Sequence, residues 1–414
     1  MKRKRSFFLL PIWVGVCFLA SCHSLRPHLE PTVVSQNIGD VPLLEVYNGC
    51  KLAFQFRGIR ILKESKPDFS LVTDWYYFNR PGTNWRFRFR LKVKAVEGET
   101  AELPGTRLIL KVDYQGGMPI STEPYLSPLY LGPLGYHWKD IPPDKFLRRL
   151  LDEIFIDIKT YCHPIVLNPP WREAARAVEA TYKLIGLPKE KINQMPFDNR
   201  YQFLVGLEAE NTAIIKVKVV EFKASQSLCL PLSGRKELAP YLRESFYCDF
   251  NHPLIRQKAR ELKGDETNAW LIAQHITSWV AENIYPLQGG PLLPASEVLK
   301  RNQGDCRQRT VLIAALARSL GIPTRGVLGL VELEGNLDYH LWPEFFVGEW
   351  VGLDPYRLIP GPMNNYLLDP SHIKLAYLRL DRETIKDIVY ALGDIFGRLK
   401  IEVLDFKLRE LEKK

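Results

Sequence analysis

Cys306 lies between Asp305 and Arg307 in the stretch NQGDCRQRTVLIAALARSLGIPTR, at the point where apolar residues begin to recur with the period of a helix. Asp305 is suited to cap the start of this helix, and Gly321 followed by Pro323 is typical of its end. A thiol in the first helical turn faces unpaired backbone N–H groups and the positive end of the helix dipole, which favour a thiolate. Cys306 is therefore a candidate nucleophile, and the alternative is a cysteine that only packs under the helix end.

A candidate base and a candidate carboxylate follow on two predicted strands. The segments YHLWPEFFV and EWVGLDPYR flank a turn at Gly348, which predicts a hairpin with His340 on its first strand and Asp354 at the end of its second. Counting outward from the turn places these two side chains opposite each other to within about two residues. A carboxylate there would fix the imidazole tautomer while the other ring nitrogen faces the Cys306 sulfur. The three residues predict a triad of the papain type.

Four separated motifs in this part of the chain resemble the transglutaminase-like superfamily of papain-related cysteine enzymes: GDC, LIAALARSLGIPTRGVLG, HLWPE and WVGLDP. The resemblance covers about residues 245–360 and implies an α+β fold with a papain-like transglutaminase core at 246–360. The β-rich part before the core is similar to the antiparallel, sandwich-like domains that often precede it in bacterial members. The resemblance also implies that Cys306 is the nucleophile, that His340 is the general base and acid, and that Asp354 orients His340.

Two further residues match the HxWxE motif of this family. Trp342 and Glu344 follow His340 at even spacing, so strand parity puts them on its face, where we expect them to pack and to support the site. Pro343 between them lacks an N–H donor, which predicts an edge strand or a bulge beside His340. Arg325, in GIPTR, is expected to form a structural pair rather than to anchor a substrate.

The expected reaction is acyl transfer through a thioester. The Cys306 thiolate would attack an amide carbonyl while His340 protonates the leaving amine; water or an amine would then resolve the thioester, so hydrolysis and transamidation both stay open. The backbone N–H of Cys306 and the side chain of Gln303 are the candidate oxyanion donors. Arg307 stands where the animal cross-linking enzymes have tryptophan, which weakens the case for true cross-linking. No metal or organic cofactor is required, and the sequence has no CxxC pair and no HxxxH pattern.

Two non-catalytic interpretations stay open. In the first, the chain is an envelope lipoprotein whose transglutaminase-like and β domains serve only as a binding or scaffold module, although an intact triad argues against a decayed site. In the second, the basic row Arg86, Arg88, Arg90, Lys92 and Lys94 binds an anion; the solvent-facing side of a sheet strand carries the same pattern. A salt-dependent affinity for an acidic polymer that survives Cys306→Ala would favour the second interpretation.

The elements that must position these residues fall into two regions. Residues 43–245 are expected to form one or two sandwich-like units of antiparallel β structure with helical inserts. Alternating apolar residues predict strands at 84–96, 106–114, 201–209 and 212–224, and helical spacing predicts helices at 145–158, 171–187 and 268–284. His275 on the last of these helices is expected to be a partly packed residue rather than a catalytic one. Residues 361–414 predict a helix at 382–396 and a strand at 398–406 that pack on the core.

The N-terminus predicts export. Residues 2–5 are basic and precede the apolar run 7–21, which has the length of a signal-peptide core and is short for a membrane span. LASC, ending at Cys22, resembles a bacterial lipobox, so residues 1–21 are expected to be a signal peptide, Cys22 a lipidated membrane anchor and 22–42 a leader. An ordinary signal peptide with an incidental Cys22 is the alternative. We therefore expect a lipid-anchored protein that faces the periplasm or the cell exterior and acts on envelope proteins or peptides.

Net charge and cysteine count set two further bounds. The formal charge of +9 becomes 9 − 4 = +5 without the four basic residues at 2–5, which is a mildly basic surface and predicts no nucleic-acid partner. Besides Cys17 and Cys22 the chain has five cysteines, compatible with one reactive thiol and up to two disulfides, or with reduced cysteines that pack as small apolar residues. Pairing among Cys50, Cys162, Cys229 and Cys248 stays open.

Overall fold

The computed structural model describes residues 32–409 except 39–40, 58, 81–82, 97–104, 120–135, 141, 143, 163–164, 169–173, 199, 233–235, 288–291, 334–335, 357–366 and eleven positions between 382 and 397. The predicted signal peptide, the lipidation site at Cys22 and the first part of the leader lie outside the described residues, as does most of the predicted helix at 382–396.

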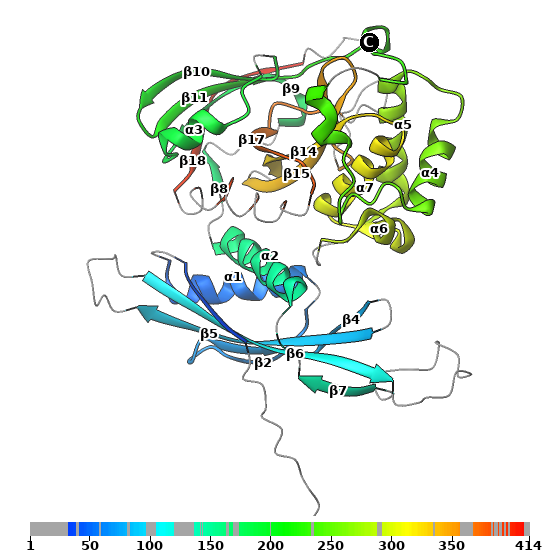
Figure 1. The fold of residues 1–414 in the computed structure, drawn as a ribbon. Helices are drawn as coiled ribbons and strands as arrows, with labels where there is room; N and C mark the ends of the chain where they lie inside the picture. The colour runs from blue at the N-terminus through cyan, green and yellow to red at the C-terminus, as the bar shows by residue number, and fades with distance from the viewer. Residues whose placement is uncertain are drawn as a thin grey trace, which may run out of the picture.

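Residues 32–162 form a seven-stranded sheet with two helices on one face (Figure 1). The strand order is β1-β6-β5-β3-β2, with β4 on β5 and β7 on β6, and every pair is antiparallel. The long strand β5 alternates as predicted, because Phe87, Phe89, Leu91 and Val93 are buried on one face. The elements are β1 Thr32–Asn37, α1 Leu43–Phe56, β2 Ile61–Ser65, β3 Ser70–Thr73, β4 Tyr76–Arg80, β5 Thr83–Val96, β6 Gly105–Pro119, β7 Tyr136–Asp140 and α2 Lys145–Cys162.

Helices, rather than a second sheet, cover the apolar face of this sheet. α2 forms because its apolar residues recur at helical spacing and make one stripe: Leu147, Leu150, Leu151, Ile154, Phe155 and Ile158 are all buried. This stripe shares a hydrophobic core with α1, β5 and β6. The predicted antiparallel β structure is therefore confirmed, but the sandwich-like packing expected for this region is wrong, since α1 and α2 take the place of the facing sheet.

A nine-stranded sheet runs through the rest of the chain, in the order β10-β11-β9-β18-β8-β15-β14-β17 with β16 on β15. All pairs are antiparallel except β18 with β8. The strands from the β-rich region thus extend the same sheet that carries the predicted triad. The strands are β8 Ile165–Asn168, β9 Ala177–Ile185, β10 Gln202–Ala209, β11 Thr212–Lys218, β14 Thr324–Leu333, β15 Asn336–Phe346, β16 Trp350–Gly352, β17 Ile373–Leu378 and β18 Lys400–Leu408.

Four helices gather beside β14 and β15, and α7 lies among them (Figure 1). Residues 308–318 of α7 are all buried, so the helix that begins at Cys306 is held on all sides. The remaining elements are α3 Lys189–Gln194, α4 Pro253–Lys263, α5 Ala269–Asn283, β12 Tyr285–Pro286, α6 Ala295–Arg301, β13 Gln303–Gly304, α7 Cys306–Ser319 and short 3-10 turns at Ala174–Arg176, Ala224–Gln226 and Lys236–Leu242. The mixed α+β class with antiparallel sheets predicted from the sequence is confirmed.

The helix predicted at 171–187 is wrong. Residues 177–185 form strand β9, which lies between β11 and β18 in the large sheet. Ala180, Tyr182 and Leu184 alternate into the core, so a two-residue period was present beside the alanine-rich sequence that favours a helix. Strand pairing on both sides outweighs the helix propensity of the alanines, which favours a helix by less than about 1 kcal/mol per residue.

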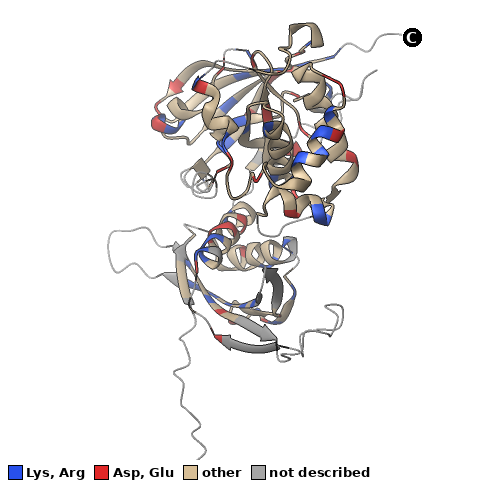
Figure 2. Ribbon diagram, turned by 45° about the vertical axis from the view of Figure 1, so that its right-hand side comes forward, with Lys and Arg blue, Asp and Glu red and all other residues tan. Residues whose placement is uncertain are grey.

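The basic row on β5 is partly neutralised within its own sheet. Asp113 on β6 binds Arg88 and also Arg90, with 2.8 Å to the latter, and Gln115 accepts from Arg86. Charges of both signs are interspersed along the helices of the C-terminal part (Figure 2). These pairings favour the interpretation of the row as the solvent-facing side of a sheet. None of the helices within the described residues is long and apolar enough to cross a membrane.

Candidate active site

Cys306 is the first residue of α7, and the start of that helix is capped as predicted. The Asp305 carboxylate accepts from the backbone N–H of Gln308 at 3.0 Å, and the Gln308 side chain accepts from the Asp305 N–H at 3.2 Å. This reciprocal capping box fixes the first turn of the helix. Cys306 itself is half-buried, so its sulfur is held at a rigid helix end with access to a cavity.

His340 and Asp354 meet as the hairpin register predicts. His340 lies on β15, and Asp354 comes two residues after β16, which pairs with β15 through Glu344 and Gly352. The Nε2 atom of His340 is 3.0 Å from Oδ2 of Asp354, and both side chains are buried. The other Asp354 oxygen accepts from the backbone N–H of Tyr356 at 3.0 Å, which fixes the carboxylate.

Cys306 and His340 line the same cavity, where the two side chains interact. Because Asp354 engages Nε2, Nδ1 is the ring nitrogen left to face the sulfur. Burial alone would lower the pKa of His340, but the Asp354 carboxylate and the sulfur outweigh it and raise the pKa to about 10. Burial would raise the pKa of Asp354, yet the His340 and His372 imidazoles hold it well below its usual range. The site therefore favours an imidazolium paired with a carboxylate.

The HxWxE residues take different places behind the site. Trp342 is fully buried and its ring stacks on His340, with centroids 6.0 Å apart at 25°. Glu344 lies further along β15, where its carboxylate accepts from Arg325 at 2.6 and 2.8 Å and pairs with Lys374 at 2.7 Å. Arg325 is thus a structural pairing residue, as expected.

An edge strand or a bulge was expected at Pro343. β15 has no bulge there, because its register with β14 is continuous, and its ladder with β16 ends at Glu344, so Pro343 lies just beyond the paired part of that side. The Pro343 carbonyl accepts from the Leu353 N–H at 3.2 Å, just past the end of β16. The N and C=O of one strand residue point to the same side, so the position without an N–H donor is also on this side. No ladder donor is needed at that point.

A second histidine, which the sequence did not reveal, shares the Asp354 carboxylate. The Nε2 atom of His372 is 3.1 Å from Oδ2 of Asp354, the same oxygen that His340 contacts. Its Nδ1 atom is 3.2 Å from both the carbonyl and a carboxylate oxygen of Asp369. His372 lies just before β17, whose pairing with β14 brings it to the site across a long loop. No local motif marks this position, so only the sheet register could have placed it.

A cavity of about 510 Å³ opens at the predicted triad and is walled partly by α2. Cys306, His340, Asp354 and Tyr356 line it from the core, and the residues from α2 are Glu153, Ile156, Asp157, Thr160 and Tyr161. Tyr356 also donates its hydroxyl to the Gly304 carbonyl at 2.9 Å. Gln303, the predicted oxyanion residue, is exposed on β13 and is not among the residues that line the cavity.

A buried charge network joins α2 to the residue after the cysteine. Glu153 contacts Nη1 of Arg57 at 3.2 Å and Nη1 of Arg307 at 3.5 Å, and accepts the Leu292 N–H at 3.1 Å. Arg307 also binds Asp305 at 2.6 Å. All candidate catalytic residues predicted from the sequence lie after residue 245, so the contribution of α2 was missed. The amphipathic pattern of 145–158 predicts a helix but not what its polar face contacts.

The other predicted or unassigned groups lie outside this site. In the described residues Cys50, Cys162, Cys229, Cys248 and Cys306 are free thiols, and Cys229 is exposed. Burial raises the pKa of Cys162 to about 12 and that of Cys248 to about 11. His275 is exposed on α5. The described part of the chain has no group of three or more His, Cys, Asp or Glu placed to hold a metal ion.

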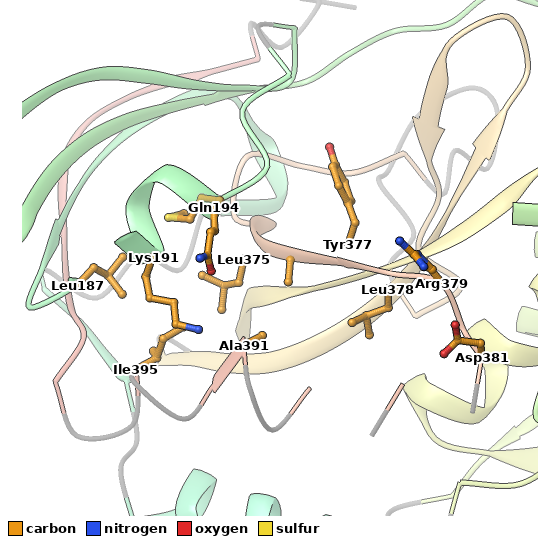
Figure 3. Close-up of a pocket in the computed structure, with 12 residues that line it drawn as sticks. Leu187, Lys191, Gln194, Leu375, Tyr377, Leu378, Arg379, Asp381, Ala391 and Ile395 are labelled. Carbon is orange, nitrogen blue, oxygen red and sulfur yellow. The ribbon is translucent and has the colours of Figure 1, made fainter. Parts of the chain in front are cut away.

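A second cavity, of about 620 Å³, lies between α3 and β17 (Figure 3). Lys191 and Gln194 reach it from α3, and Leu375 and Leu378 lie on β17. Neither cysteine nor histidine is among the described residues that line it, so it does not repeat the chemistry of the first cavity.

One family model matches the segment that contains the candidate catalytic residues. Residues 256–355 match the family model of the transglutaminase-like superfamily, a span that includes Cys306, His340 and Asp354. No curated protein matches the chain.

Solved structures show weaker similarity. A Cytophaga hutchinsonii protein described as a "putative cysteine protease" is 19% identical over 57% of this chain and 91% of its own, with a TM-score of 0.39. A "putative protease" from Parabacteroides distasonis is 10% identical over 80% of this chain and 68% of its own (TM-score 0.22). Red sea bream transglutaminase is 11% identical over 81% of this chain and 54% of its own (TM-score 0.21).

Proposed function

We propose, on the premise that residues 256–355 form a transglutaminase-like domain, that the protein is a cysteine enzyme that acts on amide bonds through a thioester. The observation that carries this proposal is the convergence of Cys306, His340 and Asp354 at one cavity, with the imidazole bound to the carboxylate. A nucleophile, a base and a residue that orients the base are the minimum set for this chemistry.

In the proposed reaction the Cys306 sulfur attacks the amide carbonyl, and a sulfur–carbon bond forms. The carbon–nitrogen bond then breaks, and His340 gives its proton to the leaving amine. Water or a second amine attacks the thioester while His340 takes a proton from it, and the sulfur leaves. Asp354 keeps Nε2 of His340 engaged throughout, so that Nδ1 serves the sulfur and the leaving group.

The position of the cysteine also supports stabilisation of the oxyanion. The backbone N–H of Cys306 lies in the first turn of α7, where it has no partner within the helix and can donate to a developing negative charge. A second donor from Gln303 would require its exposed side chain to move into the cavity, so this assignment has no support from the geometry.

The proposed substrates are proteins or peptides of the bacterial envelope. This part of the proposal rests on the signal-like run 7–21 and the lipobox-like LASC sequence ending at Cys22, which together predict a lipid anchor beside a membrane. The cavity supports a peptide-sized substrate segment, since about 510 Å³ holds a few side chains and is lined by both apolar and polar groups.

Acyl transfer from p-nitrophenyl acetate tests the proposal. We expect site-resolved mass spectrometry to find an acetyl group on Cys306 of the parent. The Cys306→Ala protein should carry no acetyl group at this position, and the His340→Ala protein should acquire it far more slowly. Adding a primary amine such as cadaverine divides the product between acetate and acetylcadaverine, which separates hydrolysis from transamidation. Acetylation confined to the exposed Cys229 would overturn the proposal and favour the scaffold interpretation.

A further inference from the structure

Both ring nitrogens of His372 face only oxygen atoms that accept hydrogen bonds. Nε2 is 3.1 Å from Oδ2 of Asp354, and Nδ1 is 3.2 Å from the carbonyl oxygen and from Oδ1 of Asp369. A neutral imidazole has one protonated nitrogen and would direct the lone pair of the other at an acceptor. Only the imidazolium form donates in both directions.

The His372 ring is shielded from solvent by the residues around it. The ring is fully buried and lies edge-on to Trp342, with centroids 5.2 Å apart at 88°. Other hydrogen bonds hold Asp369 in place: its Oδ1 atom accepts from the Ser371 N–H at 2.9 Å and from the Ser371 hydroxyl at 2.5 Å. Tyr201 donates to the Asp369 carbonyl at 2.6 Å. The two carboxylates are therefore held in place around one ring.

We propose that His372 is a positioning residue, which as an imidazolium binds the same oxygen of Asp354 as His340 and withdraws part of the carboxylate charge from His340. The inference rests on the proposed function, because its effect is on the thiolate and imidazolium of Cys306 and His340. A permanent cation two contacts from the sulfur favours the thiolate, so Cys306 stays reactive at lower pH than it would without His372.

Among the described residues, few charged or titratable groups surround His372 and His340. Those facing His372 are Asp354, Asp369, His340 at 6.3 Å between ring centroids, and the Tyr201 hydroxyl, which donates to the His372 carbonyl at 3.1 Å. Those facing His340 are Asp354, Cys306, His372 and Tyr356, behind which Arg309 lies over the tyrosine ring. Burial would lower the pKa of His372, but Asp369 and Asp354 outweigh it and raise the pKa.

The rate of Cys306 alkylation by iodoacetamide, followed against pH by site-resolved mass spectrometry, tests the inference on the full chain. His372→Gln keeps an N–H donor toward Asp354 but removes the charge. We expect the acid limb of its profile to move up by about 1 pH unit, which is about a tenfold slower reaction on that limb. His275→Gln, the same change at an exposed histidine, should leave the profile unmoved. A lower plateau with an unmoved acid limb would mean that His372 only supports the fold, and would overturn the inference.

Nitrogen NMR of labelled histidines gives a readout that needs no reactive thiol and no change at His372. We expect both ring nitrogens of His372 to be protonated at pH 7 in the parent, and Asp369→Asn to lower the pH at which the second proton is lost. A neutral His372 at pH 7 would overturn the inference whatever the alkylation result. The two proposals fail separately: a parent Cys306 no more reactive than Cys229 would overturn the proposed function, whereas a reactive Cys306 that is indifferent to His372→Gln would overturn only the role of His372.

Discussion

Arg307 contacts Glu153 at 3.5 Å, although the two residues are 154 positions apart in the chain. The residue directly after the candidate nucleophile is thereby joined to α2, a helix that shares its core with the N-terminal sheet. Because α2 also lines the cavity at Cys306, the N-terminal unit contributes a wall of the candidate active site. The candidate catalytic residues predicted from the sequence all lie after position 245, so this contribution of α2 was not predicted.

Glu153→Gln should destabilise the protein by about 2–3 kcal/mol, because it leaves the buried guanidinium of Arg57 and the half-buried guanidinium of Arg307 without a shared carboxylate. Each arginine keeps a second partner, Asp157 for Arg57 and Asp305 for Arg307, so the loss stays below that of a fully isolated buried charge. Urea unfolding followed by tryptophan fluorescence measures the change. Glu297→Gln removes an exposed pair with Lys300 and should change stability by less than about 1 kcal/mol. Equal effects of the two substitutions would show that the network does not hold α2.

The raised pKa of His340, about 10 against an ordinary 6.5, makes stability depend on pH. Such a group contributes stability that is fully present below about pH 6.5 and is lost as the pH rises through about 10, with a slope of up to about 1.4 kcal/mol per unit. The depressed pKa of Asp354 has the opposite sign, so its contribution is lost as the pH falls below its ordinary range.

We therefore expect the free energy of unfolding of the parent to decline between pH 7 and 10 more steeply than that of Asp354→Asn. Without the carboxylate, burial lowers the pKa of His340 and the ring enters this range already neutral. Parallel stability curves for the two proteins over that range, measured in urea at each pH, would contradict the assigned His340–Asp354 pair.

Gly329→Ala should disrupt the site from the strand beside it. Gly329 on β14 pairs with His340, and a Cβ at Gly329 would come within 2.4 Å of the Trp342 ring and 2.2 Å of the Ile373 carbonyl. Since backbone and a fully buried ring cannot both move away, we expect a loss of about 3 kcal/mol and slower Cys306 alkylation. Gly206→Ala on β10 has no atom within 4 Å of its Cβ and should be nearly neutral. Thermal unfolding distinguishes the two, and a Gly329→Ala protein as stable as the control would show that Trp342 is not held against β14.

The convergence of Cys306, His340 and Asp354 at one cavity could be predicted from the sequence because each part of it depends on local structure. Asp305 caps α7 within one turn of Cys306, and a short hairpin sets the register of His340 against Asp354. His372 and Asp369 could not be predicted in the same way, since they reach Asp354 through the pairing of β17 with β14, a contact across about 45 residues with a register shift. Strand pairing at that separation depends on tertiary packing rather than on a repeating pattern.

The N-terminal half shows the same division between local and long-range information. The alternation along β5 and the apolar stripe of α2 predicted those elements correctly. Whether the sheet face would be covered by a second sheet or by helices is decided by which apolar surfaces meet, and both solutions fit the alternation. Residues 177–185 form β9 rather than the predicted helix for the same reason: long-range pairing with β11 and β18 decides their structure.

The most direct test of the central claim, that His340 activates Cys306, is the rate at which iodoacetamide alkylates Cys306 at pH 6. The exposed Cys229 serves as a reference thiol within the same molecule. We predict that Cys306 reacts at least about tenfold faster than Cys229 and that His340→Ala brings the two rates together. Equal, slow alkylation of both cysteines in the parent, unchanged by His340→Ala, would contradict the claim.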